Sequence, residues 1–308
     1  MNYVDYVKEN PNLAQMKEST RYPGLFVLKY KRNVFYDNLW DESLVEMRGR
    51  VVDANGFTVI NPFTKIFNRG ENNTDIDRDE MVLSIDKING FMAGVTYVPS
   101  LDEVVVSTTG SLDSDFVTLA EKHLHHIKDE VCKAYYLTGV VYTWLFEIVD
   151  ESDPHIIKEK PGAYLIGGRR IDEKTYVTSE LFEESLDALA VGWCVYRPTW
   201  SVCRFSDVVN EVKDYNREGV VVYGLTSGTA LKIKSPFYLV SKFLGRVGTT
   251  KLHALLNDKQ RFIQTLKDEE FLPLIDFLIT FKDIFLCSDQ QRRIGFIQTF
   301  ITARLTLN

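Results

Sequence analysis

The sequence contains few cysteines, and none of them are paired at metal-binding spacing. The 308 residues include four, at Cys132, Cys194, Cys203 and Cys287, with no CxxC motif. Widely separated thiols are typical of proteins kept in a reducing compartment, whereas disulfide-rich and zinc-binding chains show closely spaced pairs. We therefore expect free thiols and a cytoplasmic protein.

Long apolar segments are also missing. No window of about 18 residues is free of charged side chains, so we expect no membrane span. The first nine residues lack the apolar stretch and the small-residue cleavage site of a signal peptide. Hydrophobic residues make up 45% of the chain and charged residues 26%, which is ordinary for a globular protein and excludes a disordered or fibrous one.

An excess of positive charge is absent, which bears on nucleic-acid binding. The net charge is −7 at pH 7, although residues 235–308 carry ten Lys or Arg and seven Asp or Glu, a local balance of +3. An acidic protein can hold a polyanion in a local basic groove, but it does not coat nucleic acid indiscriminately. The charge therefore favours an enzyme that meets nucleic acid at ends or nicks.

Two common catalytic signatures are absent as well. The sequence contains no G-x-S-x-G and no P-loop motif. His123, His125 and His126 fall on a predicted helix with no cysteine nearby, and only His123 and His126 share a face. We expect no metal site there.

Runs of β-branched and aromatic residues, separated by Gly, Asn, Asp and Pro, predict strands over most of residues 25–240. The predicted strands are Leu25–Tyr30, Arg50–Asp53, Phe57–Ile60, Met81–Ile85, Phe91–Tyr97, Glu103–Ser107, Val140–Val149, Ala163–Arg169, Gly219–Tyr223 and Ala230–Ile233. Helical periodicity interrupts them at Asp113–Tyr135 and Ser179–Ala190. Beyond residue 240 the strand signals nearly vanish, and the predicted helices are Lys251–Phe262, Glu269–Leu286 and Gln290–Leu305.

These patterns predict an α+β protein with two domains. A mixed, largely antiparallel domain is expected over residues 1–240, followed by a small all-helical domain over residues 241–308. No pattern indicates oligomerisation, so a monomer is expected.

Four short motifs in the strand region carry the candidate chemistry. In order, they are Asp86-Lys87-Ile88-Asn89-Gly90, Phe146-Glu147-Ile148, Arg217-Glu218-Gly219-Val220-Val221 and Leu231-Lys232-Ile233-Lys234. A single motif of this kind usually marks solvated surface residues. Glu147 differs, because its neighbours from Tyr142 to Val149 are nearly all apolar and an unpaired carboxylate there costs several kcal/mol.

The order and spacing of the motifs resemble the covalent nucleotidyltransferase superfamily, which contains ATP-dependent DNA ligases, RNA ligases and mRNA-capping enzymes. The superfamily motifs read Lys-x-(Asp/Asn)-Gly, Phe/Tyr-Glu, Glu-Gly and Lys-x-Lys, and the resemblance covers roughly residues 25–235. It implies an ATP-grasp-like ligase domain in which Lys87 attacks the α-phosphate of ATP. AMP then stays attached as a lysyl-AMP intermediate while pyrophosphate leaves.

The residue types suit that chemistry. A lysine attacks only when unprotonated, and a free lysine has a pKa near about 10.4, which desolvation and nearby cations lower. Lys232 and Lys234 are one residue apart on a predicted strand, so both ammonium groups share a face and can offset charge on the α-phosphate. Glu147 and Glu218 are candidates to touch the ribose hydroxyls and to hold a divalent metal, Mg²⁺ or Mn²⁺.

Glycine and asparagine complete the expected ATP site. Gly90 and Gly219 would let the backbone pass close to the nucleotide. Asn89 provides a hydrogen-bonding side chain within the nucleophile motif.

Further matches resemble the RNA ligase 1 family of T-even-like phages. Met47-Arg48-Gly49 is similar to that family's Arg-Gly element, which implies that Arg48 contacts ATP phosphates. The segment from Asn61 to Asn68 is similar to Pro-x-x-Lys-Phe-Phe-Asn, which implies a phosphate contact for Lys65 and an adenine neighbour in Phe67. Tyr164–Arg169 is similar to a Leu-Leu-Gly-x-Arg strand. Outside such a site, Arg48, Lys65 and Arg169 would be surface charges beside strands.

Two elements depart from that family's pattern. The nucleophile motif lacks the acidic residues and the serine of Lys-Glu-Asp-Gly-Ser, because Ile88, Asn89 and Phe91 stand at those positions. Thr109 stands where the family has a lysine before Gly-Ser. One phosphate or substrate contact is then missing or supplied elsewhere, for example by Arg69.

The helical pattern after the last motif favours an RNA ligase, because DNA ligases and capping enzymes have a β-barrel there. We likewise expect no large DNA-encircling domain before residue 25. We expect an ATP-dependent enzyme that joins 5′-phosphate and 3′-hydroxyl RNA ends through an adenylylated RNA end, with magnesium. The resemblance implies RNA repair, with cleaved tRNA as a substrate to test, in the host cytoplasm if a phage encodes the protein.

Three alternatives stay open. The fold also suits DNA nick sealing or GTP-dependent capping. The altered nucleophile motif would also fit an inactive relative that binds nucleotide or RNA. The helical residues are either a substrate-contacting domain or a packing accessory.

Overall fold

The computed structural model describes residues 2–247, 249–266 and 268–306, and the chain divides into two compact units. Unit 1 comprises Met1–Ile66 and Ile88–Thr199, and unit 2 comprises Phe67–Lys87 and Trp200–Asn308. One junction falls between Lys87 and Ile88, inside the predicted nucleophile motif. The predicted site residues are therefore shared between the two units.

Unit 1 contains two four-stranded antiparallel sheets, in the orders β1-β2-β3-β4 and β10-β9-β7-β8. Their strands are β1 (Ala14–Glu18), β2 (Leu25–Tyr30), β3 (Arg48–Asp53), β4 (Thr58–Ile60), β7 (Phe91–Val98), β8 (Glu103–Thr108), β9 (Tyr142–Val149) and β10 (Gly162–Arg170). Strand β9 is buried along nearly its whole length because it pairs on both sides, with β7 and β10. This burial places Glu147 in the interior of the sheet.

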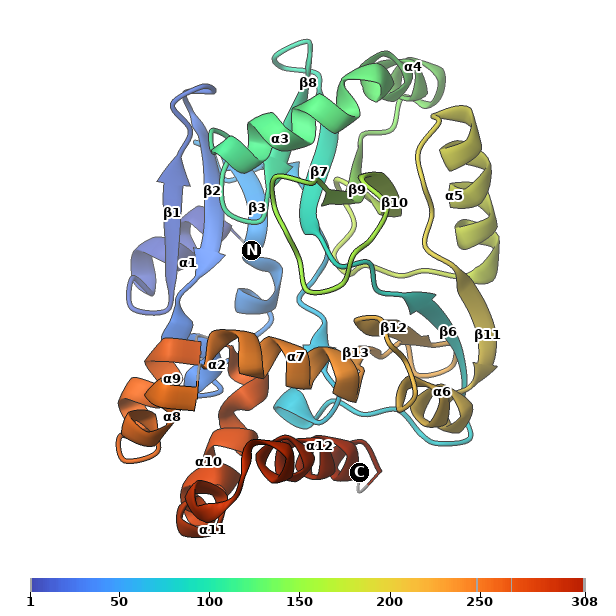
Figure 1. Cartoon of the computed structure of the whole chain (residues 1–308). Coiled ribbons are helices and arrows are strands. Elements are labelled where there is room, and N and C mark those ends of the chain that lie inside the picture. Colours follow the sequence, from blue (N-terminus) through green and yellow to red (C-terminus); the bar gives the residue numbers. More distant parts are fainter. Residues whose placement is uncertain (1, 248, 267, 307–308) are drawn as a thin grey trace. The chain divides into compact units, whose positions relative to one another are not determined.

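Helices cover the second sheet of unit 1 (Figure 1). The helices of the unit are α1 (Tyr3–Glu9), α2 (Arg32–Tyr36), η1 (Leu44–Glu46), α3 (Asp115–Leu124), η3 (His125–Ile127), α4 (Lys128–Thr138) and α5 (Glu180–Gly192). Ala120 of α3 and Leu186 of α5 share one hydrophobic core with Ala93, Phe146 and Leu165 of the sheet. This core fixes the strand that carries Glu147.

Unit 2 contains a five-stranded sheet in the order β11-β6-β12-β13-β5. The strands are β5 (Phe67–Asn68), β6 (Met81–Asp86), β11 (Trp200–Arg204), β12 (Gly219–Gly224) and β13 (Ala230–Lys234), and the nearby helices are η2 (Glu71–Asn73) and α6 (Phe205–Val212). All pairings are antiparallel except that of β13 with β5. Val82, Val222 and Ile233 of the sheet pack with Phe205 and Val209 of α6.

The last part of unit 2 is helical. Its helices are α7 (Pro236–Arg246), α8 (Thr249–Leu255), α9 (Lys259–Leu266), η4 (Glu269–Phe271), α10 (Leu272–Thr280), α11 (Lys282–Cys287) and α12 (Gln290–Thr306). They share a hydrophobic core of their own, which includes Phe243, Phe262, Ile275 and Ile297. Within the described residues no strand follows Lys234, and no helix has the length and apolar character of a membrane span.

The predicted fold class is confirmed. The structure is a mixed, largely antiparallel α+β arrangement with a helical C-terminal region. Each predicted strand has a counterpart that differs by a few residues at its ends. The separation of residues 1–240 from residues 241–308 as two domains stays a prediction.

Several predicted helices are interrupted. The expected helix Asp113–Tyr135 is divided into α3 and α4 by the turn η3. Basic Lys122 and His123 lie in the last turn of α3 and acidic Asp129 and Glu130 in the first turn of α4, which suits two helix dipoles better than one. The expected helix Lys251–Phe262 is likewise divided, because Asp258 caps α9 by accepting the backbone N–H of Arg261 at 3.0 Å.

Among the described residues, the sequence interpretation missed seven helices and strands and two short turns. They are α1, β1, α2, β5, β11, α6 and α7, with the turns η1 and η2. A local signal existed for α7, since Ser235 caps it by accepting the N–H of Tyr238 and Pro236 occupies its first turn. Strand β5 has only two residues, which is too short for a periodic pattern.

Candidate active site

Lys87 lies directly after β6, where the sheet of unit 2 fixes its backbone. The pairing of β6 with β12 sets Asp86 opposite Val220, and the N–H of Lys87 donates to the carbonyl oxygen of Gly219 at 2.9 Å. Asp86 also forms an ion pair with Arg217. Asp86 precedes Lys87 and Arg217 precedes Glu218, so this ion pair holds the two strand ends together.

The side chains of Lys87 and Glu218 meet. Lys87 Nζ lies 3.1 Å from Glu218 Oε1, and the two side chains are 23% and 3% exposed. Glu218 is the expected contact of ribose or metal, and its carboxylate lies against the expected nucleophile. The contact pairs the ammonium group of Lys87 with a buried carboxylate.

Lys232 and Lys234 occupy one face of β13. Both are half-buried. Leu231 and Ile233, which alternate with them along the strand, are fully buried in the core on the opposite face. Gly219 pairs with Lys234 and Val221 with Lys232, so the lysine strand lies next to the strand that follows Glu218. Two cations and the Lys87–Glu218 pair therefore belong to neighbouring strands.

Tyr238 links these groups, and the sequence interpretation did not identify it. Burial raises the pKa of the Tyr238 hydroxyl, the Glu218 carboxylate raises it further, and the ammonium groups of Lys234 and Lys87 oppose the increase. These three charged groups and the Glu270 carboxylate, which also raises the pKa, thus act on one phenol. Phe67, the expected adenine neighbour, is buried on β5 with its Cα opposite Leu231.

The predicted residues of unit 1 form a second group around Glu147. Oε1 of Glu147 accepts the backbone N–H of Gly90 at 3.2 Å, and Oδ1 of Asn89 accepts the N–H of Ile157 at 3.1 Å. A Cβ on Gly90 would lie 2.2 Å from the carbonyl oxygen of Ile148. The close approach to β9 therefore requires glycine at this position, and the expected approach of a nucleotide stays a prediction.

Gly219 has a comparable explanation. Its φ is +141°, and a Cβ would lie 2.0 Å from the carbonyl oxygen of Ile233. The neighbouring strand β13 therefore excludes a side chain at this position, whatever binds nearby.

Arg48 is exposed at the start of β3, beside a second cation that the sequence interpretation missed. The Cα of Lys29 is the cross-strand partner of Arg48, so both side chains start from the same side of the sheet. A side chain at Gly110 would begin 3.0 Å from Lys29 Nζ, and one at Gly49 would begin 2.7 Å from the Cα of Thr109. Lys29 thus brings an ammonium group to the turn where the family resemblance expects a lysine at position 109.

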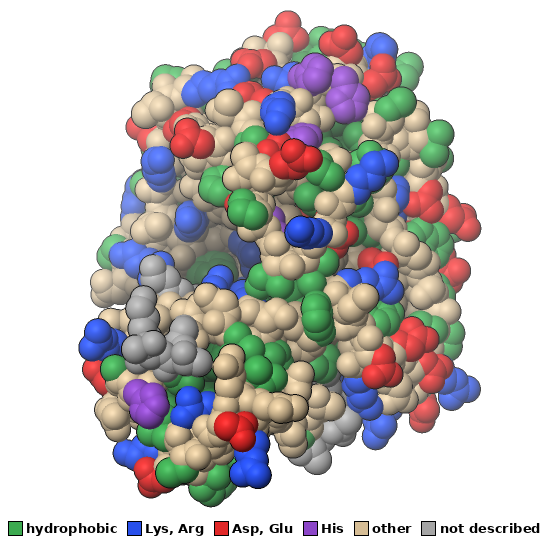
Figure 2. Space-filling view, in the orientation of Figure 1, with side chains coloured by type: hydrophobic (Ala, Val, Ile, Leu, Met, Phe, Trp, Pro, Cys, Tyr) green, Lys and Arg blue, Asp and Glu red, His purple; other side chains and the backbone are tan. Residues whose placement is uncertain are grey.

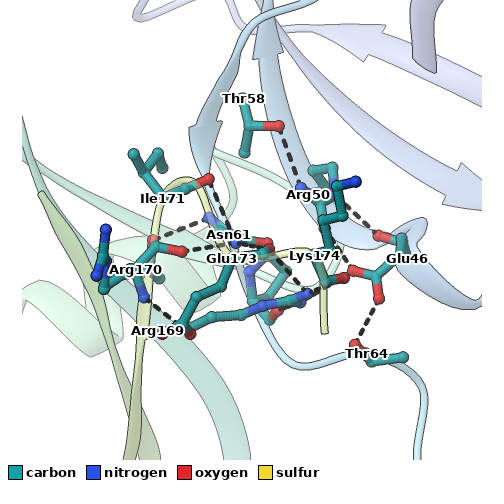
Figure 3. A network of polar contacts seen from close by, with 12 residues as sticks. Glu46, Arg50, Thr58, Asn61, Thr64, Arg169, Arg170, Ile171, Glu173 and Lys174 are labelled. Carbon is teal, nitrogen blue, oxygen red and sulfur yellow. Dashed lines mark hydrogen bonds and ion pairs between the residues drawn. The ribbon is translucent and has the colours of Figure 1, made fainter. Parts of the chain in front are cut away.

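Lys65 is buried, with its ammonium nitrogen 4.8 Å from the centre of the Trp40 ring. Its segment is held by the charged network shown in Figure 3. Glu46 forms ion pairs with Arg50 and with Arg169, and it accepts the hydroxyl of Thr64.

Arg169 is the centre of this network and is fully buried. It donates to Glu46 at 2.9 Å, to the carbonyl oxygen of Pro62 at 2.6 Å and to that of Lys174 at 2.7 Å (Figure 3). Arg169 and Lys65 both lie in the interior of unit 1, so the alternative interpretation of these two residues as surface charges does not hold. Arg169 instead holds the segment that leads to Lys65.

Two other groups of charged residues have local partners. Arg69, the suggested substitute for a missing contact, pairs with Asp75 at 2.9 Å and packs on Phe205. Figure 2 shows histidine side chains at the surface over α3 and α4. His123 Nε2 lies 2.6 Å from Asp150 Oδ2, and no group of three or more potential metal ligands occurs among the described residues.

Glu147 and Glu218 suit a divalent metal by donor type. Both are buried carboxylates, and carboxylate oxygen is the ligand that Mg²⁺ and Mn²⁺ prefer. Each of them uses Oε1 in the contacts given above. Glu147 belongs to unit 1 and Glu218 to unit 2.

Comparison with solved structures identifies the fold. Two forms of an archaeal ATP-dependent RNA ligase align with TM-scores of 0.55 and 0.56, in each case with 14% identity over 98% of this chain and 77% of theirs. A candidate ATP-dependent DNA ligase from Aquifex aeolicus aligns with a TM-score of 0.50 and 12% identity, over 92% of this chain and 81% of its own. No protein-family model matches the chain, and no curated protein sequence matches it. The chain therefore shares the nucleotidyltransferase fold of these ATP-dependent ligases.

Proposed function

We propose that this protein is an ATP-dependent RNA ligase that joins 5′-phosphate and 3′-hydroxyl ends through a lysyl-AMP intermediate. The observation that carries the proposal is the group in unit 2, where Lys87 lies 3.1 Å from Glu218 and Lys232 and Lys234 share a face of a neighbouring strand. This group occurs on a fold shared with ATP-dependent ligases.

The first step forms a bond between Lys87 Nζ and the α-phosphorus of ATP. The ammonium group must first lose a proton, and the Glu218 carboxylate lies in position to accept it. The amine then attacks, the bond to the β-phosphate oxygen breaks, and pyrophosphate leaves. Lys232 and Lys234 offset the charge that grows on the phosphates.

A divalent metal held by Glu218 or Glu147 would supply further positive charge to the phosphates. The protein residues themselves position the nucleophile. The hydrogen bond from the N–H of Lys87 to Gly219 and the Asp86–Arg217 ion pair fix the backbone on both sides. A fixed backbone reduces the entropy that Lys87 must lose before it attacks.

In the second step the RNA 5′-phosphate attacks lysyl-AMP, and AMP moves to the RNA end as Lys87 is released. In the third step the 3′-hydroxyl attacks that end, a phosphodiester bond forms and AMP leaves. We assign Arg48, Lys65, Phe67, Asn89 and Gly90 to ATP binding on the family resemblance.

The helical region supports RNA as the substrate. Among the described residues after Lys234 there are helices and no strand. The DNA ligases and capping enzymes that the motifs resemble have a β-barrel at that place. The likeness to the Aquifex aeolicus protein keeps DNA nick sealing as the second candidate. Membership of the T-even RNA ligase 1 type and a role in tRNA repair remain proposals.

Covalent labelling tests the central step. The protein is incubated with α-³²P-ATP and magnesium, and an acid-sensitive label is expected on the wild type and on the control Lys133→Ala, which removes an exposed lysine of α4. Lys87→Ala is expected to take no label. A wild type without label, or Lys87→Ala labelled as strongly as the wild type, would refute the mechanism.

Substrate comparison tests the rest. Labelled GTP replacing ATP distinguishes a capping-type enzyme. Single-stranded 5′-phosphorylated RNA is compared with nicked duplex DNA, and sealing of RNA is expected. Efficient sealing of DNA alone would refute the RNA assignment, and labelling without any sealing would indicate a binding relative.

A further inference from the structure

Glu270 connects the helical region of unit 2 to the lysine strand. Its Oε2 forms an ion pair with Lys234 Nζ, and its Oε1 accepts a hydrogen bond from Lys242 Nζ of α7 at 2.8 Å. Each carboxylate oxygen therefore has an ammonium group of its own. Glu270 belongs to the turn η4, some 36 residues beyond Lys234 in the sequence.

The contact is buried on both sides. The side chains of Glu270, Lys234 and Lys242 are 8%, 12% and 11% exposed. Burial raises the pKa of Glu270, but Lys234 and Lys242 outweigh it and lower the pKa to about 2. The carboxylate is therefore charged at any pH where the enzyme works. A charged pair at this depth is held in one geometry, because separating it leaves an uncompensated buried charge.

Asp268 gives an internal comparison. It lies in the same segment, and it pairs with Lys242 at 3.3 Å and with Arg246. The contacts of Asp268 are thus to the helix α7, whereas Glu270 also reaches the lysine on β13. The two acidic residues differ in their link to the proposed chemistry.

We infer that Glu270 is a positioning residue for the ligase reaction, which orients the ammonium group of Lys234 toward the phosphates of ATP. The inference rests on the proposed function. It gives the helical region a role in the adenylylation step itself, before any RNA is bound. A preorganised cation stabilises charge that develops in the transition state without the cost of reorientation during the reaction.

The test compares Glu270→Gln with Asp268→Asn, each of which removes one negative charge from the same cluster. Single-turnover labelling with α-³²P-ATP is followed over a range of ATP concentrations. In Glu270→Gln we expect the rate at saturating ATP to fall about tenfold to a hundredfold. The half-saturating ATP concentration should change by less than about threefold. Asp268→Asn should label at the wild-type rate, even if it lowers the melting temperature as much as Glu270→Gln does.

A second readout does not depend on catalysis. Lysine acylation by an N-hydroxysuccinimide ester, mapped by mass spectrometry, reports how firmly Lys234 is held in its buried ion pair with Glu270. We expect Lys234 to be acylated several-fold faster in Glu270→Gln and at the wild-type rate in Asp268→Asn. Glu270→Asp keeps the charge and should restore part of the labelling rate, which guards against a general folding defect.

The outcomes separate the two proposals. A wild type that labels, together with a Glu270→Gln protein that matches Asp268→Asn in both labelling and acylation, overturns the inference alone. Glu270→Gln that changes only the melting temperature has the same meaning. A wild type that takes no label overturns the proposed function and, with it, the assignment of Glu270 to the reaction.

Discussion

At the scale of single residues, two neighbouring arginines on β10 show how burial decides the contribution of a charged side chain to the free energy of unfolding. Arg169 is fully buried and bonded to Glu46 and to three backbone carbonyl groups. Arg170 is exposed and pairs with the exposed Asp172. The two side chains alternate across the sheet, so one faces the interior and the other faces solvent.

Arg169→Met is expected to lower the free energy of unfolding by about 3–5 kcal/mol, because it leaves Glu46 buried with one partner fewer and several carbonyl oxygens unpaired. Urea denaturation at neutral pH measures the change. Arg170→Met is the control and should change stability little, since exposed pairs contribute little. Equal losses for the two variants would contradict the structural role assigned to the buried network.

Gly90 provides a second prediction at this scale. Gly90→Ala would place a Cβ 2.2 Å from the carbonyl oxygen of Ile148, a contact that requires the backbone to shift. We expect a loss of about 1–3 kcal/mol in the free energy of unfolding. Lysyl-AMP formation should also weaken, because the shift moves the Gly90 N–H away from Glu147.

The control for Gly90 is Gly245→Ala in α7, where a Cβ meets no atom within 4 Å. A helical glycine replaced by alanine should raise stability by about 0.5–1 kcal/mol. If Gly90→Ala behaved like Gly245→Ala, the close approach to β9 would not be the reason for glycine at position 90.

At the scale of elements, the strands were easier to predict than the contacts between them. β9 and β12 are runs of apolar and β-branched residues, a pattern that is local and survives any tertiary context. The proximity of Lys87 to Glu218 depends on the pairing of β6 with β12 across about 130 residues, and no local pattern encodes such a register. The motif resemblance supplied the candidates, and the sheet order brought them together.

Other parts of the site had no usable sequence signal. Glu270 lies in a short turn, and nothing near it in sequence indicates Lys234 as its partner. Nothing in the sequence around Lys29 distinguishes it from other strand lysines. It lies opposite Arg48 because of the bulge in the pairing of β2 with β3. These contacts arise from tertiary packing, so a single sequence could not predict them.

The ion pair between Glu270 of η4 and Lys234 of β13 makes a contribution to stability that depends on pH. The pKa of Glu270 is about 2, below its usual value of 4.5, so the ion pairs contribute fully above pH 4.5 and are lost as the pH falls toward 2. The stability difference between the wild type and Glu270→Gln should therefore shrink by roughly 2 kcal/mol between pH 6 and pH 3. Thermal unfolding at pH 6 and pH 3 provides the comparison.

Asp276→Asn serves as the control for that experiment, because Asp276 pairs with Lys259 in an exposed position. Its difference from the wild type should be small at both pH values. A constant difference between the wild type and Glu270→Gln from pH 6 to pH 3 would show that the Glu270 carboxylate is not held in its charged form.

At the scale of the whole molecule, charge is distributed unevenly along the chain. The net charge is −7, yet residues 235–308 have a balance of +3. Many cations of the helical region are engaged in ion pairs, as Lys242 and Arg246 are. Lys259, Arg261 and Arg292 are exposed, and the ion pairs of Lys259 with Asp276 and of Arg292 with Asp289 lie at the surface.

If the helical region contacts RNA, removal of these three exposed cations should weaken sealing without affecting adenylylation. The variant Lys259→Ala/Arg261→Ala/Arg292→Ala is expected to raise the half-saturating RNA concentration by about threefold to tenfold at low salt, because fewer counterions are released on binding. The salt dependence of sealing should become shallower for the same reason.

Lysyl-AMP formation should remain at the wild-type rate, since Lys87, Glu218 and the Lys234–Glu270 pair are unchanged. A matched variant, Lys8→Ala/Lys17→Ala/Lys133→Ala, removes three exposed lysines of unit 1 and controls for net charge. Equal effects in both variants would mean that RNA responds only to total charge, and no effect in either would make the helical region a packing element whose link to the reaction runs through Glu270 alone.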